Sequence, residues 1–159
     1  MPAKANALNI SRHFTESGKD PFDNLSWSKR DVEIRNFDGS VAFSMKDVNL
    51  PDNYSQVAAN VLAQKYLRKA GIPKKLRKVK EKAVPSWLQR SVPDLKSMEN
   101  LSEEEKFGEE IDGKQTFRRL AGTWTYWGWK HGYFASEEDA KAYFDEMCYM
   151  LASQMVAPN

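Results

Sequence analysis

Cys148 is the only side chain in this sequence that could serve as a thiol nucleophile. A single cysteine cannot form an intramolecular disulfide or a zinc site of the CxxC type. Cys148 falls four residues after Phe144, at the edge of the apolar face of a predicted helix, where cysteine usually serves as a small core residue. The two histidines, His13 and His131, lie far apart and bring no ligand cluster with them. We therefore expect Cys148 to be a core residue, and we expect no metal site.

The second candidate is a run of positive charge. Residues 74–82 carry six lysine and arginine side chains and one glutamate. Such a run can follow a phosphate backbone, with Trp87 as a stacking platform for a base. No groove-reading motif accompanies the charge, so a solvated connector, or a patch that meets the acidic stretch 103–112, is the simpler interpretation. The adjacent glutamates that follow Ser102 fit the first turn of a helix better than a metal site.

The third candidate is the aromatic segment WTYWGWK, residues 124–130. Trp124 and Trp127 are three residues apart and share one face of a predicted helix, whereas Tyr126 and Trp129 share another. An aromatic ligand box is one interpretation. A helix packed between two other elements is the better one, because large rings on two sides of a helix both need cover. We therefore predict that these four residues are packing residues at interfaces.

The apolar spacing predicts the elements that hold these candidates. Alternating side chains on either side of Asp38-Gly39 predict a β-hairpin over about 30–45. Apolar residues at three- and four-residue spacing predict a helix over about 55–70, which Gly71 would end. The order of elements is therefore a hairpin followed by helices.

Three regions follow from this order. Residues 1–12 form a leader without a clear period. Residues 13–100 hold the hairpin, the first helix and an irregular basic and proline-containing linker, and residues 101–159 hold a helical pair. The second helix of the pair begins at Ser136, which with Asp139 approximates a capping box. We predict a mainly α fold with one small β-hairpin.

Composition limits the class of protein. The chain has 159 residues, of which 41% are hydrophobic and 29% charged, as in an ordinary globular domain. The net charge of +2 does not by itself imply a nucleic-acid partner. No apolar run is long enough for a membrane span or a signal peptide, so we expect no membrane partner and a cytoplasmic location.

Several stretches, in this order, resemble the N-terminus of adenosylcobalamin-dependent (class II) ribonucleotide reductases. The resemblance covers the chain from about Ser11 to Asn159. The combination of WTYWGWK, GYF and EEDA is the most specific part of it. The stretches are RHFTESGKDPFD, EIRNFDGSVAFSM, YSQVAANVLAQKYLRKAGIP, VPSWLQRSVPD and RLAGTWTYWGWKHGYFASEEDAKAYFDEMCYMLASQMVAPN.

The resemblance implies a fold and an activity. The hairpin and the helical region would pack on a following α/β barrel, which is absent here. The complete enzyme would be a ribonucleoside-diphosphate reductase, with a triphosphate substrate left open, that makes deoxyribonucleotides. Adenosylcobalamin would generate a radical that passes to a cysteine, and a second pair of cysteines would supply the reducing electrons.

The resemblance assigns no catalytic, cofactor-binding or metal residue in this chain, because that mechanism needs at least three cysteines. Pro158 and Asn159 are at most the leading edge of a substrate loop. We expect a non-catalytic fragment, or one piece of a split enzyme, whose partner is the barrel. Adenosylcobalamin and the ribonucleotide would bind only the complete enzyme. The alternatives are a free-standing basic module that binds nucleic acid and an independent small enzyme that uses Cys148.

Overall fold

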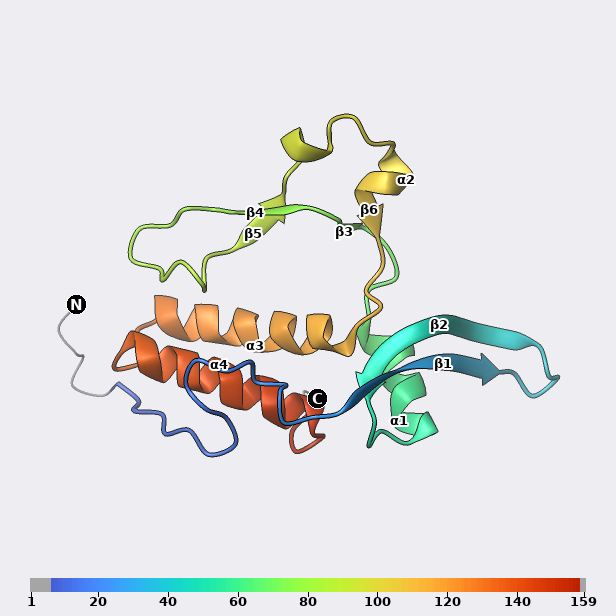
Figure 1. Ribbon diagram of the computed structural model, residues 1–159, viewed down its shortest axis with the longest axis horizontal. Helices are drawn as coiled ribbons and strands as arrows, with labels where there is room; N and C mark the ends of the chain where they lie inside the picture. Colours follow the sequence, from blue (N-terminus) through green and yellow to red (C-terminus); the bar gives the residue numbers. More distant parts are fainter. Residues whose placement is uncertain (1–6, 158–159) are drawn as a thin grey trace.

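A long β-hairpin forms the first part of the fold. The computed structural model describes residues 7–157, and the hairpin, the helices and an extended arm are arranged as Figure 1 shows. Strands β1 (Trp27–Arg35) and β2 (Val41–Pro51) pair antiparallel with Val32 opposite Met45. Gly39 closes the turn with a left-handed φ of 83°. The hairpin predicted over about 30–45 is confirmed and extends further at both ends.

The first helix is shorter than predicted. Helix α1 (Gln56–Val61) begins at Ser55, whose side chain accepts a hydrogen bond from the Ala58 amide, and continues as one π-helical segment, Leu62–Tyr66. The prediction that it reaches about residue 70 is wrong. The Arg68 amide donates to Glu110 Oε2 and the Arg68 carbonyl accepts from the Glu110 amide, each at 2.9 Å. This exchange holds the backbone extended, so the helix cannot continue.

Residues 72–108 form an arm that crosses over the helical pair (Figure 1). Two antiparallel strand pairs occur where the sequence predicts an irregular linker, because strands of two or three residues carry no readable period. One pair joins the two ends of the arm and the other lies between them. The pairs are β3 (Ile72–Pro73) with β6 (Phe107–Gly108) and β4 (Leu76–Lys78) with β5 (Ser91–Pro93).

Two short helical turns complete the arm. A 3-10 turn spans Lys96–Met98, and α2 (Glu103–Lys106) precedes β6. Ser102 caps α2 in a capping box with Glu105. The glutamates after Ser102 therefore form a helix N-terminus, as the sequence predicts.

The helical pair predicted for the last part of the chain is confirmed. Helices α3 (Gly113–Lys130) and α4 (Glu137–Ala152) lie side by side and antiparallel (Figure 1). Asp112 and Gln115 form a capping box at the start of α3. Ser136 accepts from the Asp139 amide at the start of α4, but the Asp139 carboxylate does not return to the Ser136 amide. Its oxygens bind the Ser136 hydroxyl and the Ile10 amide instead.

The core lies where β1, β2, α1 and the helical pair meet. Phe22, Val48, Leu50, Phe117 and Leu151 are among its buried side chains. Helix accounts for 34% of the chain and strand for 22%, so a mainly α fold is not confirmed, although the hairpin and the helices are. Every helix within residues 7–157 is too short or too polar to cross a bilayer.

The close approach of the Phe134 ring to the backbone of α3 at Gly128 gives a test of this packing. A Cβ on Gly128 would lie 2.7 Å from Phe134 Cε2, whereas a Cβ on Gly122 would make an ordinary contact of 3.7 Å with Phe144. We predict that Gly128→Ala lowers the free energy of unfolding by about 1–3 kcal/mol through overpacking. Gly122→Ala, the matched control, should raise it by up to about 1 kcal/mol through helix propensity. Urea denaturation of both variants measures the difference, and equal effects would contradict the close approach.

Candidate functional site

One aromatic face of α3 is covered by the arm. Tyr126 Oη donates to Glu81 Oε2 at 2.6 Å, and Trp129 Nε1 donates to the Ala83 carbonyl at 2.7 Å. The hydrogen bond from Tyr126 and the ion pair with Arg90 hold the pKa of Glu81 below its usual value. The arm therefore provides partners for the polar atoms of both rings.

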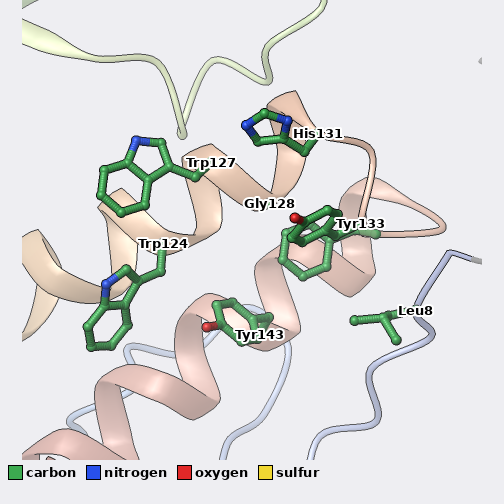
Figure 2. A pocket seen from close by; sticks show the side chains of 8 residues that line it. Leu8, Trp124, Trp127, Gly128, His131, Tyr133 and Tyr143 are labelled. Atoms are coloured by element: carbon green, nitrogen blue, oxygen red, sulfur yellow. The ribbon is translucent and has the colours of Figure 1, made fainter. Parts of the chain in front are cut away.

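The other aromatic face of α3 lines an open groove of about 580 Å³. Figure 2 shows Trp124 and Trp127 along α3, with Tyr143 opposite them on α4 and Leu8 and Tyr133 at the end of the groove. Trp127 is 57% exposed and Tyr133 58% exposed. The helix thus has one aromatic face with polar partners in the arm and one on which Trp124 packs partly against the core while Trp127 is exposed.

The N-terminal segment builds the end wall of the groove. The Leu8 amide donates to the Tyr133 carbonyl at 2.7 Å, and the Leu8 carbonyl accepts from the Ala135 amide at 3.0 Å. Leu8 also forms a parallel bridge with Phe134, whose ring covers Gly128. Residues 1–6 of the predicted leader lie outside the described residues.

Acidic side chains of α4 hold the N-terminal segment in place. Glu146 accepts from the Thr15 hydroxyl at 2.6 Å and from the amides of Phe14 and Thr15 at 3.1 and 2.9 Å. Asp145 is fully buried and pairs with Arg12 at 2.8 Å and with Lys141. The sequence analysis does not predict this cluster. Asp145 and Glu146 lie outside the apolar stripe that contains Phe144, Met147 and Leu151, so the spacing gives no sign that a second side of α4 is buried.

A second apolar groove, of about 320 Å³, lies nearer the start of α3. Leu120, Trp124 and Trp127 follow at four- and three-residue spacing and therefore share one helix face. Leu120 lines the second groove, Trp127 lines the first, and α1 contributes Val61 to the second. The two grooves thus lie on the same face of α3, one toward each end of the helix.

A family model described as class II vitamin B12-dependent ribonucleotide reductase matches residues 28–154. The chain belongs to this family. The match corresponds to the N-terminal region of these reductases, as the resemblance in the sequence predicts.

Curated relatives support the same assignment. The vitamin B12-dependent ribonucleotide reductases of Agrobacterium fabrum (strain C58) and Bradyrhizobium diazoefficiens are 54% and 53% identical to this chain over 152 residues. The alignments cover 96% of this chain. A relative from Streptomyces avermitilis is 30% identical over 158 residues, or 98% of the chain. The chain spans only 12–13% of the length of these relatives.

Cys148 does not fit the role of a thiol that takes part in radical transfer from the cobalamin cofactor that the family implies. Such a transfer requires a thiol that the reacting groups can approach. Cys148 is completely buried, with Sγ 4.0 Å from the Phe117 carbonyl. Burial, and then the charge of Asp145, raise the pKa of this thiol, so it stays protonated. No group of three metal-binding side chains occurs within residues 7–157.

The remaining candidates have structural partners or lie outside the described residues. The ring of Trp87 packs against Phe144 with centroids 5.8 Å apart, and its Nε1 donates to Glu137 at 3.0 Å. Trp87 is therefore not a free stacking platform. Pro158 and Asn159, the predicted edge of a substrate loop, lie outside the described residues.

The buried carboxylates predict a pH-dependent stability. Burial alone would raise the pKa of Glu146, but the hydrogen bonds from Thr15 and the neighbouring amides lower it overall. A carboxylate with a lowered folded-state pKa contributes stability that is present above its unfolded pKa of about 4.3. That contribution is lost as the pH falls through the folded pKa.

We predict that Glu146→Gln lowers the free energy of unfolding by about 1–3 kcal/mol at pH 7. The cost should shrink as the pH falls below about 4, since the parent chain then protonates the same group. Glu138→Gln, at a side chain that is 64% exposed, is the control and should change stability by less than about 0.5 kcal/mol. Urea titrations from pH 7 to pH 3 measure these values. A cost for Glu146→Gln that does not vary with pH would contradict the role of the charge.

Thiol labelling tests the assignment of Cys148. Because the side chain is buried and its pKa raised, we predict that a thiol reagent modifies it at least about 100-fold more slowly in the folded chain than in urea. The time course of labelling by mass spectrometry measures both rates. Rapid labelling in the folded state would show that the thiol is accessible.

Proposed function

We propose that this chain is the N-terminal part of a ribonucleotide reductase that makes deoxyribonucleotides by adenosylcobalamin-initiated thiyl-radical chemistry. Membership of the family supports the activity of the complete enzyme. The role of this chain in it is structural, because its one cysteine is buried. The cofactor, the ribonucleotide and the reducing cysteines belong to the rest of the enzyme.

The open aromatic groove is the surface on which the rest of the enzyme packs. The exposure of Trp127 is the observation that carries this proposal, because the opposite face of the same helix already has partners in this chain. Covering one such ring stabilises a contact by about 2 kcal/mol. The occupant we propose is the α/β barrel that the sequence resemblance implies. The relatives, of which this chain spans 12–13%, have ample further sequence to supply it.

The second groove extends the same contact. Leu120 and Val61 line it, and Val61 is 47% exposed. Because Leu120, Trp124 and Trp127 share one face of α3, a single partner surface can cover both grooves. Tyr126 and Trp129 remain with the arm, so the four aromatic residues serve two different interfaces.

The matched variants Trp127→Lys and Phe37→Lys test this proposal in the complete enzyme. Both rings are exposed in this chain, Trp127 in the groove and Phe37 at the hairpin turn. A lysine at position 127 would place a charge in a desolvated contact, so we predict a lower melting temperature and at least roughly tenfold less nucleotide reduction. Phe37→Lys should change neither.

The melting temperature of the isolated chain shows whether Trp127→Lys impairs docking or folding. Trp127→Lys should leave the melting temperature of the isolated 159-residue chain within about 2 °C of the parent, because the ring is exposed there. If the complete enzyme tolerates both variants equally, the groove does not face the rest of the enzyme.

A further inference from the structure

The cationic segment, residues 74–82, forms an exposed strip on the arm. All six of its lysine and arginine side chains are exposed. Strand β4 lies within it and is held extended by pairing with β5, with Arg77 opposite Val92. Arg77 and Lys78 lie in this strand, whereas the other four cations lie in the bends, loop and turn on either side of it. The segment therefore presents six exposed positive charges within nine residues, and the strand pair holds its middle in place.

The acidic stretch does not neutralise this cationic segment. Glu103 pairs with Lys106 at 2.8 Å, and Glu110 pairs with Arg119 at 2.9 Å. Glu105 completes the capping box of α2, and Lys74 contributes only a minor charge effect on it. Within residues 7–157, no cation of the cationic segment forms a salt bridge.

The one acidic residue inside the segment is also engaged elsewhere. Glu81 binds Tyr126, Arg90 and, at 3.9 Å, Lys130. Lys78 donates to backbone carbonyls at Trp87 and Gln89, which fixes the strip without reducing its charge. Four cationic side chains of the segment have no hydrogen bond or ion pair among the residues that the structure describes. These are Lys74, Arg77, Lys80 and Lys82.

We propose that the cationic segment binds the phosphate backbone of a nucleic acid without reading its sequence. A dense group of exposed cations complements a polymer with one negative charge per nucleotide, and counterion release from that polymer drives the association. Strands of three residues are too short to enter a groove and read base edges, and Trp87 is occupied by Phe144. The interaction is therefore electrostatic and independent of the docking groove.

Fluorescence anisotropy with a labelled 20-nucleotide oligothymidine and a labelled 20-base-pair duplex tests the proposal between 50 and 200 mM NaCl. The triple variant Arg77→Ala, Lys80→Ala, Lys82→Ala should weaken binding of at least one probe by roughly tenfold or more at 50 mM NaCl. The slope of log K against log salt should fall by about 2–3, close to one for each phosphate contact removed. The two probes distinguish a single strand from a duplex.

The matched control removes the same charge elsewhere. The triple variant Lys29→Ala, Lys46→Ala, Lys65→Ala changes three exposed lysines outside the arm and should retain the parent slope. Circular dichroism should show that both triple variants remain folded. The proposal fails if neither probe binds at 50 mM NaCl, or if both triple variants weaken binding equally.

An acidic protein surface is the competing partner. Polyglutamate of matched charge should compete for the segment at least roughly tenfold less well than the oligonucleotide, and equal competition would assign the segment to an acidic protein instead. Neither triple variant changes Trp127 or the groove. Failure of the nucleic-acid proposal would therefore leave the docking proposal intact, and failure of the docking proposal would leave the nucleic-acid proposal intact.

Discussion

The packing of α3 against α4 is the contact on which the other elements depend. Phe134 covers Gly128 at the end of this pair, and Phe117 and Leu151 join its other end to the core beneath the hairpin. The hairpin, the N-terminal segment and the arm each attach to one of the two helices. The hairpin meets the start of α3 through the Asn49 amide, which donates to the Ile111 carbonyl at 2.8 Å. The acidic residues of α4 hold the N-terminal segment. The arm crosses the Tyr126 face of α3.

Elements with a long hydrophobic period were predictable from the sequence. The hairpin around Gly39 and the two long helices follow directly from alternation and from three- and four-residue spacing, and Ser102 and Ser136 mark helix starts where the structure has them. The prediction of Cys148 as a core residue also rests on its position in a helical stripe, and its burial confirms it. In each case the signal lies in residues that are close together in the sequence, so the prediction does not require knowledge of a distant partner.

Features that depend on distant partners could not be predicted in this way. The early end of α1 is set by Glu110, more than forty residues later, and the arm is ordered by strands too short to show a period. The burial of Asp145 and Glu146 contradicts their polarity and makes sense only with Arg12 and Thr15 beside them. The two aromatic pairs of α3 were visible in the sequence, but not which pair the arm covers.

We propose that α3 is a two-sided helix, with one aromatic face closed by the arm and the other closed by the rest of a class II ribonucleotide reductase. Hydroxyl-radical footprinting read by mass spectrometry tests it most directly, because it reports the exposure of single aromatic side chains in this chain and in the complete enzyme. The account predicts that Trp127 and Tyr133 are oxidised readily in the isolated chain and protected at least roughly fivefold in the complete enzyme, while Phe37 reacts equally in both. Equal oxidation of Trp127 in the two forms would contradict it.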